Sequence, residues 1–338
     1  MAKKIILLIN LGSPDSLELS SVKKYLNEFL LDERVIDIPY IIRKILVSGI
    51  IVPTRAKGSL ERYKSIWTEN GSPLVEISKE LTLLVEKETK IPSYLCMRYG
   101  NPNPKDVLRK ISKEHSDLEE IVLFPLYPHY AMSSYETAVE YVKSIHKSMG
   151  YSFKLKTIPA FYNNPSYIDS LADSIKPFLE KDFDLVLFSY HGIPERHVKK
   201  ADPTKSHCLM SSDCCDKASE AHKYCYRHQV IETTKLVANK LGLPNSKFQF
   251  SFQSRLGRDK WLSPYTSTLL KEFGAKAIQN LIVVCPAFVS DCLETLEEIC
   301  IEGKEEFLKN GGKDFQVVPC LNTNSKWVET IKEMVTNV

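Results

Sequence analysis

The sequence predicts an α/β fold of two similar Rossmann-like halves, each with a four-stranded, mainly parallel sheet flanked by helices. Along the 338 residues, short β-rich runs alternate with segments of helical periodicity, a pattern typical of βαβ crossovers. Several of these runs are continuously apolar, as strands buried on both faces are. Four strand candidates come before a seam near residues 158–165 and four come after it, so we expect domains at residues 1–160 and 161–338.

The first strand candidate begins the chain's folded part. Its apolar stretch, Ile5 to Ile9, is too short for a signal peptide and ends at Asn10, so it indicates a buried strand. The remaining candidates share β-rich composition and flanking turn residues. All eight are Lys4–Asn10, Ser93–Tyr99, Glu120–Tyr127, Phe153–Ala160, Asp184–Tyr190, Phe248–Ser254, Asn280–Cys285 and Gln316–Cys320. Helical spacing marks Pro73–Thr89, Ala131–Met149, Val230–Leu241 and a final helix from about Ser325.

Composition excludes several classes of protein. The formal net charge of +3 is too small for a nucleic-acid binder that works by phosphate neutralisation. Neither familiar glycine-rich nucleotide motif occurs, and no apolar run is long enough to span a membrane. We expect a cytoplasmic protein, in which nine cysteines are thiols or metal ligands rather than disulfides.

Parallel sheets bind ligands beyond the carboxyl ends of their strands, so the residues that follow each strand are the first to consider. Those segments carry polar, aromatic and cysteine residues. They are residues 10–14, 97–102, 125–130, 189–196, 252–255 with 261–264, and 285–296.

This set of strand-end segments resembles that of the ferrochelatases, enzymes that insert ferrous iron into a porphyrin. The run Ser-Tyr-His-Gly-Ile-Pro-Glu-Arg at 189–196 and the run Phe-Val-Ser-Asp-Cys-Leu-Glu-Thr-Leu at 288–296 are specific and occur in the family's order. The resemblance extends from the Leu-Gly-Ser-Pro turn at 11–14 to the helix of Trp327. It implies a chelatase-type fold, a lyase of haem biosynthesis, and Fe²⁺ and a porphyrin as substrates.

His191 is the first catalytic candidate. Two pyrrole protons must leave a porphyrin as the metal enters, and a neutral imidazole is a suitable acceptor near pH 7. The local alternative is a histidine satisfied by backbone at a strand end. The resemblance implies an active-site histidine here, and it leaves open whether that histidine accepts protons or binds iron.

Glu294 is the second catalytic candidate. With Asp291 it could form a capping box, which is the local alternative. However, Glu294, Glu298 and Glu302 form a column in which like charges repel, and the family has an acidic ridge here that is thought to pass metal to the histidine. Carboxylate oxygens suit transient binding of Fe²⁺. Because residues four apart drift by about 40° on an α-helix, we also predict a π-type turn in this helix.

Porphyrin contacts are predicted at aromatic, basic and small polar residues. Trp261, Tyr99 and Tyr127 offer flat surfaces, although such residues are often core, and Arg98 could bind a propionate bidentately. The resemblance adds Ser72 and Ser254, with Arg55 a weaker propionate partner.

Leu11 bears on the choice of porphyrin. Relatives that metallate coproporphyrin commonly carry a tyrosine in the turn where Leu11 lies, so we predict protoporphyrin IX as substrate and protohaem as product. Coproporphyrin III is the alternative.

An apolar segment, residues 38–53, lies within the expected porphyrin lip at residues 34–57. It could pack on the core as a helix. The family instead uses this region as a lip over the porphyrin, and an exposed lip could make peripheral contact with a membrane, with Arg43, Lys44, Arg55 and Lys57 at the headgroups.

Residues 205–226 form a polar insert with four of the nine cysteines. Cys208, Cys214, Cys215 and Cys225 fit no common zinc or ferredoxin spacing. The insert resembles that of bacterial ferrochelatases that hold a [2Fe–2S] cluster on four cysteines. A zinc site with His207 or His222 and free thiols are the alternatives. Elsewhere, Cys292 stands where some relatives have histidine, which makes an additional ligand there doubtful.

Two other functions fit parts of the pattern. A non-catalytic, two-lobed porphyrin or metal carrier is disfavoured by the combination of His191 with the acidic column. A chelatase for cobalt or nickel is disfavoured by the extended ferrochelatase motifs in both halves. The sequence does not determine the cellular metal preference or the oligomeric state.

Overall fold

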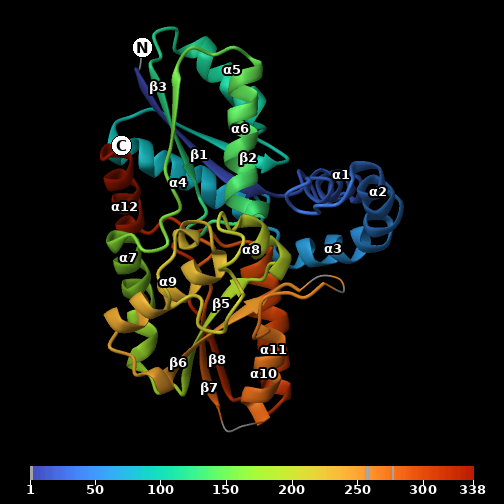
Figure 1. Cartoon of the computed structure of the whole chain (residues 1–338), viewed down its shortest axis with the longest axis vertical. Helices are drawn as coiled ribbons and strands as arrows, with labels where there is room; N and C mark the ends of the chain where they lie inside the picture. Colours follow the sequence, from blue (N-terminus) through green and yellow to red (C-terminus); the bar gives the residue numbers. More distant parts are fainter. Residues whose placement is uncertain (1–2, 256, 258, 276–277) are drawn as a thin grey trace. The chain divides into compact units, whose positions relative to one another are not determined.

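The computed structural model describes residues 3–255, 257, 259–275 and 278–338, which form two compact units. The first unit comprises Met1–Leu126, Met132–Pro159 and Thr323–Val338, and the second comprises Tyr127–Ala131 and Ala160–Asn322. Each unit has one four-stranded sheet with helices around it (Figure 1).

The sheet of the first unit is parallel throughout, in the order β2-β1-β3-β4. Its central strand β1 is buried from Ile5 to Asn10. The strands are β1 (Lys4–Gly12), β2 (Ser93–Tyr99), β3 (Glu120–Pro125) and β4 (Lys154–Thr157). The helices are α1 (Leu19–Leu30), α2 (Tyr40–Lys44), η1 (Ile45–Ile51), α3 (Val52–Ile66), α4 (Pro73–Thr89), α5 (Pro104–Glu114), η2 (Met132–Glu136), α6 (Thr137–Ser148) and α12 (Ser325–Thr336).

The second unit repeats this arrangement in the order β6-β5-β7-β8, again parallel. Its central strand β5 pairs with β6 so that His191 lies opposite Gln253. The strands are β5 (Leu185–His191), β6 (Phe248–Gln253), β7 (Asn280–Val284) and β8 (Asp314–Val317). The helices are α7 (Pro165–Ile175), η3 (Lys176–Glu180), α8 (Glu195–Ala201), η4 (Glu220–Lys223), α9 (Tyr226–Lys240), η5 (Asn245–Lys247), α10 (Thr266–Ala275), η6 (Glu294–Gly303) and α11 (Lys304–Lys309).

The predicted fold class is confirmed, since the two sheets have four parallel strands each. The last strand was placed too late, because β8 spans Asp314–Val317 rather than Gln316–Cys320. Its apolar end was misread: Val318 and Leu321 are buried beyond the strand, in the loop before α12.

The C-terminal helix α12 belongs to the first unit, whereas the predicted boundary put it in the second half. It lies beside α4 (Figure 1). Trp327 is fully buried there, with its ring 6.2 Å from that of Phe124 on β3. The amphipathic face of α12 therefore completes the core of a sheet that the chain built before residue 160.

The short segment Tyr127–Ala131 follows β3 of the first unit in the chain but belongs to the second unit. It is the converse of α12, which follows the second unit but belongs to the first. His129 is buried against the rings of Tyr190 and Tyr226 and makes a 2.9 Å hydrogen bond with Thr233. Burial lowers the pKa of His129 to about 3, so this imidazole is neutral. It is therefore a core histidine.

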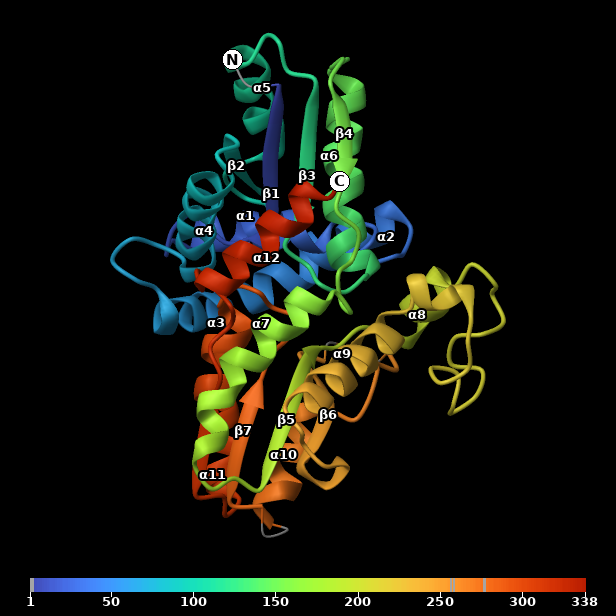
Figure 2. The same ribbon diagram turned by 90° about the vertical axis from the view of Figure 1, so that its left-hand side faces the viewer.

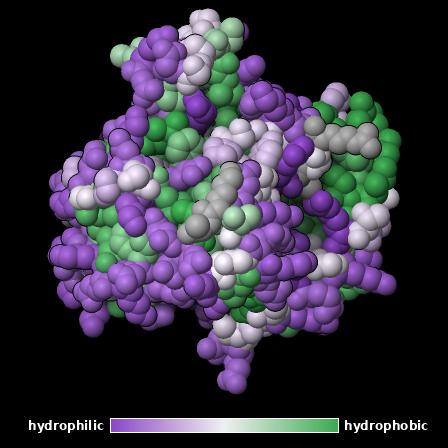
Figure 3. Space-filling model, turned by 90° about the horizontal axis from the view of Figure 1, so that it is seen from below, coloured by the Kyte–Doolittle hydropathy of each residue, from purple (hydrophilic) through white to green (hydrophobic). Residues whose placement is uncertain are grey.

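The lip segment exposes its apolar side chains. The exposed fractions of Ile41, Ile42 and Ile45 are 73%, 58% and 64%. Figure 3 shows a hydrophobic patch at its right-hand edge, the side on which α2 lies in Figure 1. Arg43 does not face outward, as a contact with lipid headgroups would require. It is buried, and its guanidinium donates hydrogen bonds of 3.0 Å to the carbonyls of Ile36 and Ile38, so it ties the segment together instead of facing lipid headgroups.

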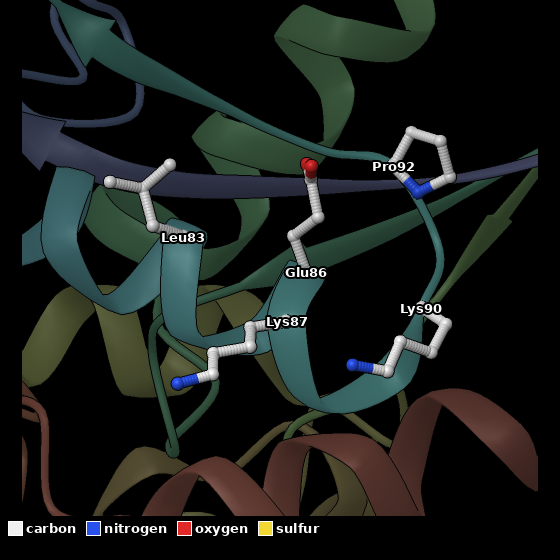
Figure 4. Close-up of a pocket in the computed structure, with 5 residues that line it drawn as sticks. All are labelled: Leu83, Glu86, Lys87, Lys90 and Pro92. Atoms are coloured by element: carbon white, nitrogen blue, oxygen red, sulfur yellow. The ribbon is translucent and has the colours of Figure 1, made fainter.

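A small open pocket lies at the end of α4, lined by Leu83, Glu86, Lys87, Lys90 and Pro92 (Figure 4). Glu86 is already engaged there, because its carboxylate accepts a 2.8 Å hydrogen bond from the Ser93 amide. None of the predicted site residues lines this pocket. Among the helices that the structure describes, none is both long and apolar enough to cross a membrane.

Candidate functional site

His191 is the last residue of β5, and its side chain is half-buried. Its Nδ1 lies 2.6 Å from the Gly192 carbonyl oxygen. A carbonyl can only accept a hydrogen bond, so Nδ1 carries the ring proton and Nε2 keeps its lone pair. The backbone therefore fixes the tautomer that leaves a base, or a metal ligand, at Nε2. A structural histidine at a strand end would also make a backbone contact of this kind. Here the contact occupies Nδ1 and leaves Nε2 available for chemistry.

Gly192 and Trp261 pack tightly beside the histidine. A Cβ on Gly192 would lie 2.9 Å from the Gln253 carbonyl oxygen and 3.2 Å from the Trp261 ring, so only glycine fits. Trp261 is also bridged to Pro194 through the backbone, and its side chain is almost fully buried. In the described part of the chain, its indole Nε1 has no hydrogen-bond partner. A buried donor of this kind is available to a bound group.

Gln253 connects the strand ends to the acidic helix. Its amide nitrogen donates a 3.0 Å hydrogen bond to the Glu294 carbonyl, and its amide oxygen accepts one of 2.7 Å from Ser189. Sequence reasoning passed over Gln253, although it lies in the strand-end segment 252–255. The available signal was an amide at the carboxyl end of β6, the edge strand that pairs with β5.

The predicted π-type turn is confirmed, because η6 is a π-helix from Glu294 to Gly303. The carboxylate column rises along it: Glu294 and Glu298 are half-buried and Glu302 is exposed. The capping-box alternative is not found. No side chain caps this helix. Asp291 instead accepts hydrogen bonds from Thr295 Oγ1 and the Asn322 amide.

Glu298 is held by the residue that follows β6. The Ser254 amide donates a 2.7 Å hydrogen bond to Glu298 Oε1, and the Ser254 hydroxyl donates a short one to Oε2. Ser254 adopts a φ of +64° to do so, a region that residues other than glycine rarely occupy. Burial, joined by the charge of Glu294, raises the pKa of Glu298, while the Ser254 hydrogen bonds and the charge of His191 oppose this.

Glu298 interacts electrostatically with both His191 and Glu294, so these three side chains lie in one neighbourhood of the second unit. A base and two carboxylates, one of them with a raised pKa, therefore lie in the same neighbourhood. Groups of this kind can accept protons, and carboxylate oxygens are suitable donors for a divalent cation.

The predicted porphyrin contacts divide between the units. Tyr127, Ser254 and Trp261 belong to the second unit with His191. Leu11, Arg55, Ser72, Arg98 and Tyr99 belong to the first. Leu11 is half-buried after β1, Arg55 is exposed on α3, and Ser72 is buried at the N-cap of α4.

Arg98 and Tyr99 are engaged within the first unit. Arg98 forms a buried ion pair with Asp32 and donates a 2.8 Å hydrogen bond to Thr137. Its guanidinium lies 4.3 Å and 4.2 Å from the ring centroids of Tyr99 and Tyr141. Tyr99 is fully buried, and its hydroxyl donates to Asp32 at 3.0 Å. Asp32 is therefore the centre of this network, although no sequence motif marks it. A propionate contact for Arg98 stays a prediction.

The cysteine insert lies in the looped segment between α8 and α9 (Figure 2). Hydrogen bonds to Asp202 order its first part. The Asp202 carboxylate accepts hydrogen bonds from the amides of Thr204, His207 and Cys208 at 2.8–2.9 Å. His207 and His222 both approach the Cys214 carbonyl, at 2.7 Å and 3.2 Å, and His222 stacks on His228 with ring centroids 3.5 Å apart. A polar loop without a hydrophobic core is thus fixed by hydrogen bonds.

The four cysteines of the insert are all buried, and their side chains form a series of contacts. Cys225 makes side-chain hydrogen bonds with Cys208 and Cys215, and Cys215 makes another with Cys214. The hydrogen bond with Cys208, and after it burial, raises the pKa of the Cys225 thiol to about 12. Over the described ranges, no group of three or more His, Cys, Asp or Glu side chains is arranged to hold a single metal ion.

Comparison with known proteins identifies the family. The ferrochelatase family model matches residues 3–338. A ferrochelatase from Pseudomonas entomophila is 44% identical over 339 residues, with 100% of both chains covered. One from Stutzerimonas stutzeri is 43% identical over 336 residues, covering 99% of this chain and 98% of the relative.

A solved structure shares the fold. SirB from Bacillus subtilis with Fe³⁺ has a TM-score of 0.55 and 9% identity, covering 99% of this chain and 95% of SirB. At this identity the likeness shows a shared fold and carries no conclusion about function. Since the family model and full-length relatives match essentially the whole chain, the chain belongs to the ferrochelatase family.

Proposed function

We propose that this protein inserts Fe²⁺ into protoporphyrin IX to form protohaem, with release of two protons. The observation that carries the proposal is His191, whose Nδ1 is committed to the Gly192 carbonyl so that Nε2 presents a lone pair beside the acidic helix. Family membership supports the reaction, and the geometry supports the role of the histidine.

In this proposal His191 Nε2 accepts the pyrrole protons, and Fe²⁺ approaches along η6. Glu302 is exposed, whereas Glu298 and Glu294 are half-buried, so the column offers carboxylates from solvent inward. The raised pKa of Glu298, caused mainly by burial, makes it a suitable group to share a proton that leaves the histidine.

The test is metallation by His191→Ala under anaerobic conditions, with porphyrin fluorescence loss as the readout. We expect turnover to fall by about 100-fold or more because a general base of this kind contributes that much. Circular dichroism should be unchanged, since the hydrogen bond from Tyr226 goes to the His191 carbonyl, which alanine retains. Near-normal turnover in a folded variant would remove His191 from the mechanism.

Choice of porphyrin is a separate step of the proposal. Leu11 has no oxygen to approach the iron, and the exposed lip around Ile41 and Ile45 suits the apolar vinyl edge of protoporphyrin. We expect a higher kcat/KM with protoporphyrin IX than with coproporphyrin III, and the reverse order would show that coproporphyrin III is the substrate. Tight binding of either porphyrin without turnover would favour a carrier, and faster insertion of Co²⁺ or Ni²⁺ would favour another chelatase.

We also propose that Cys208, Cys214, Cys215 and Cys225 hold a [2Fe–2S] cluster. Four thiolates are the usual ligand set for this cluster, and these four thiols are buried and in mutual contact. A two-iron cluster divides its ligands into two pairs, so it does not require three ligands around one ion. When bound, such a cluster supplies one-electron redox chemistry and cross-links the insert.

Metal and sulfide analysis of anaerobically purified protein tests the cluster. Iron in excess of the porphyrin substrate site, with equimolar acid-labile sulfide, is expected, and Cys215→Ser should lose both. Cys300→Ser is the matched control, because Cys300 lies on η6 outside the insert. Zinc without sulfide would support a site with His207 or His222, and neither metal nor sulfide would leave free thiols.

A further inference from the structure

Arg227 lies directly against two of the insert cysteines. Its Nη1 is 3.1 Å from Cys215 Sγ and 3.7 Å from Cys214 Sγ. Arg227 is the second residue of α9, and Cys225 is the N-cap of that helix. The positive end of a helix dipole and a guanidinium therefore meet at the same group of sulfur atoms.

The charge of Arg227 also acts on Asp216, whose pKa it helps to lower. Across the residues that the structure describes, Arg227 forms no ion pair with a carboxylate. The nearby Asp216 is paired with Lys235 at 2.9 Å. The next residue along α9, His228, makes a 3.0 Å hydrogen bond with the Cys215 carbonyl, so the backbone of this cysteine is held while its sulfur faces the guanidinium.

We propose that Arg227 is a positioning residue for the cysteine centre: its guanidinium holds the Cys214 and Cys215 sulfurs and raises the reduction potential of the cluster they bind. This inference rests on the proposed [2Fe–2S] cluster. Hydrogen bonds and positive charge at ligand sulfurs stabilise the more negative, reduced state. Reduction takes one electron from a low-potential reductant such as dithionite and converts one ferric ion to ferrous, with no bond made or broken.

The experiment is a redox titration of the intact protein followed by electron paramagnetic resonance. Arg227→Gln removes the charge, and Arg227→Lys keeps it on a shorter donor. Lys223→Gln is the matched control, because Lys223 is an exposed cation of the same insert whose ammonium lies over the Tyr224 ring at 5.7 Å. Iron, sulfide and the visible spectrum are measured for each variant.

We expect Arg227→Gln to favour the oxidised cluster at least tenfold, a fall in midpoint potential of about 59 mV for one electron. Arg227→Lys should shift less, and Lys223→Gln should match the wild type. If Arg227→Gln loses its cluster, its potential cannot be titrated. If Arg227→Lys then keeps the cluster, this result supports the proposal, because it shows that the positive charge at position 227 holds the Cys214 and Cys215 sulfurs in place.

Three outcomes would overturn the inference. An unchanged potential in Arg227→Gln, or an equal shift in Lys223→Gln, would show that the guanidinium does not act on the cluster. Loss of the cluster from both Arg227 variants would indicate packing rather than charge. A wild-type protein with no acid-labile sulfide would overturn the proposed cofactor itself, and this result is read before any variant is compared.

Discussion

At the scale of single residues, function depends on what the backbone does to a side chain. His191 would be an ordinary strand-end histidine without the 2.6 Å contact to the Gly192 carbonyl, which assigns the ring proton to Nδ1. Glu298 would be an ordinary helix carboxylate without Ser254, whose left-handed backbone aims both its amide and its hydroxyl at Glu298. Neither contact involves an unusual residue type.

The two inner carboxylates should respond differently to loss of charge. Glu298 is held by the Ser254 amide and hydroxyl, and a glutamine can keep part of that hydrogen bonding. Glu294 is instead in hydrogen-bond contact with the Cys292 thiol, which is a weak donor, so we expect Glu294 to be the easier of the two carboxylates for iron to engage. We expect metallation by Glu294→Gln to fall about 100-fold and by Glu298→Gln about tenfold or less. Steady-state rates at varied Fe²⁺ measure this. Equal, small losses would indicate that the column is only a solvated helix face.

Asp32 should make the stability of the first unit depend on pH. Burial opposes its charge, but the Thr137 hydrogen bond and the Arg98 guanidinium outweigh this, so its pKa lies below the ordinary 3.8. A lowered pKa stabilises the folded protein above about pH 4, and that stabilisation is lost as the pH falls through the folded-state value.

Asp32→Asn should therefore lower the free energy of unfolding at pH 7 by about 3 kcal/mol, because it leaves Arg98 buried without its partner. The difference from wild type should shrink below about pH 4. Urea unfolding at several pH values measures it. Glu61→Gln breaks an exposed pair with Lys64 and should cost less than about 1 kcal/mol. A pH-independent difference would contradict the assignment.

At the scale of elements, α2 and η1 together are unusual because they turn apolar side chains outward. A helix face this hydrophobic normally packs on a core. Here Val47 of η1 and Val52 of α3 supply the inward contacts, with Leu30 of α1. Ile41, Ile42, Ile45 and Ile50 stay exposed. Lys44, Arg55 and Lys57 are exposed around them, so the segment combines an apolar face with cationic neighbours.

This combination predicts binding to anionic lipid vesicles. Replacing Ile41 and Ile45 by serine should weaken vesicle binding by tenfold or more, because each buried isoleucine contributes roughly 1.5–3 kcal/mol. Leu83→Ser is the control, since Leu83 is 68% exposed on α4 and lies outside the lip. Vesicle sedimentation measures both, and binding that survives the double substitution would exclude the lip as the contact.

At the scale of the whole molecule, the chain order and the compact units do not coincide. The last helix returns to the first unit, and Trp327 lies fully buried there. The core of the first unit therefore includes residues that follow the whole second sheet in the chain, which links the stability of the first unit to the last 16 residues, Thr323–Val338.

Trp327→Ala should destabilise the first unit by about 3–5 kcal/mol, the usual cost of emptying a large buried side chain. Hydrogen exchange should accelerate in β1 and β3 more than in β5 and β7. Lys332→Ala is the control from the same helix, because its pair with Glu88 is exposed to solvent and should contribute little to stability. Faster exchange confined to β5 and β7 would contradict this prediction.

The sequence by itself determined the fold class, nearly all strand positions and the strand-end location of His191. Local sequence patterns indicate which strands are buried on both faces and that strands alternate with helices. A parallel sheet follows from these two features. The π-helix was also predictable, because the spacing of Glu294, Glu298 and Glu302 is a property of one continuous segment.

Only the tertiary structure decided which distant residues meet. Arg98 pairs with Asp32, which lies 66 positions away. Arg43 turns inward to two carbonyls, and α12 joins the first unit. Local patterns specify whether a side chain is buried and which way its strand or helix faces. They do not specify its partner, because that choice depends on the packing of segments brought together from far apart in the chain.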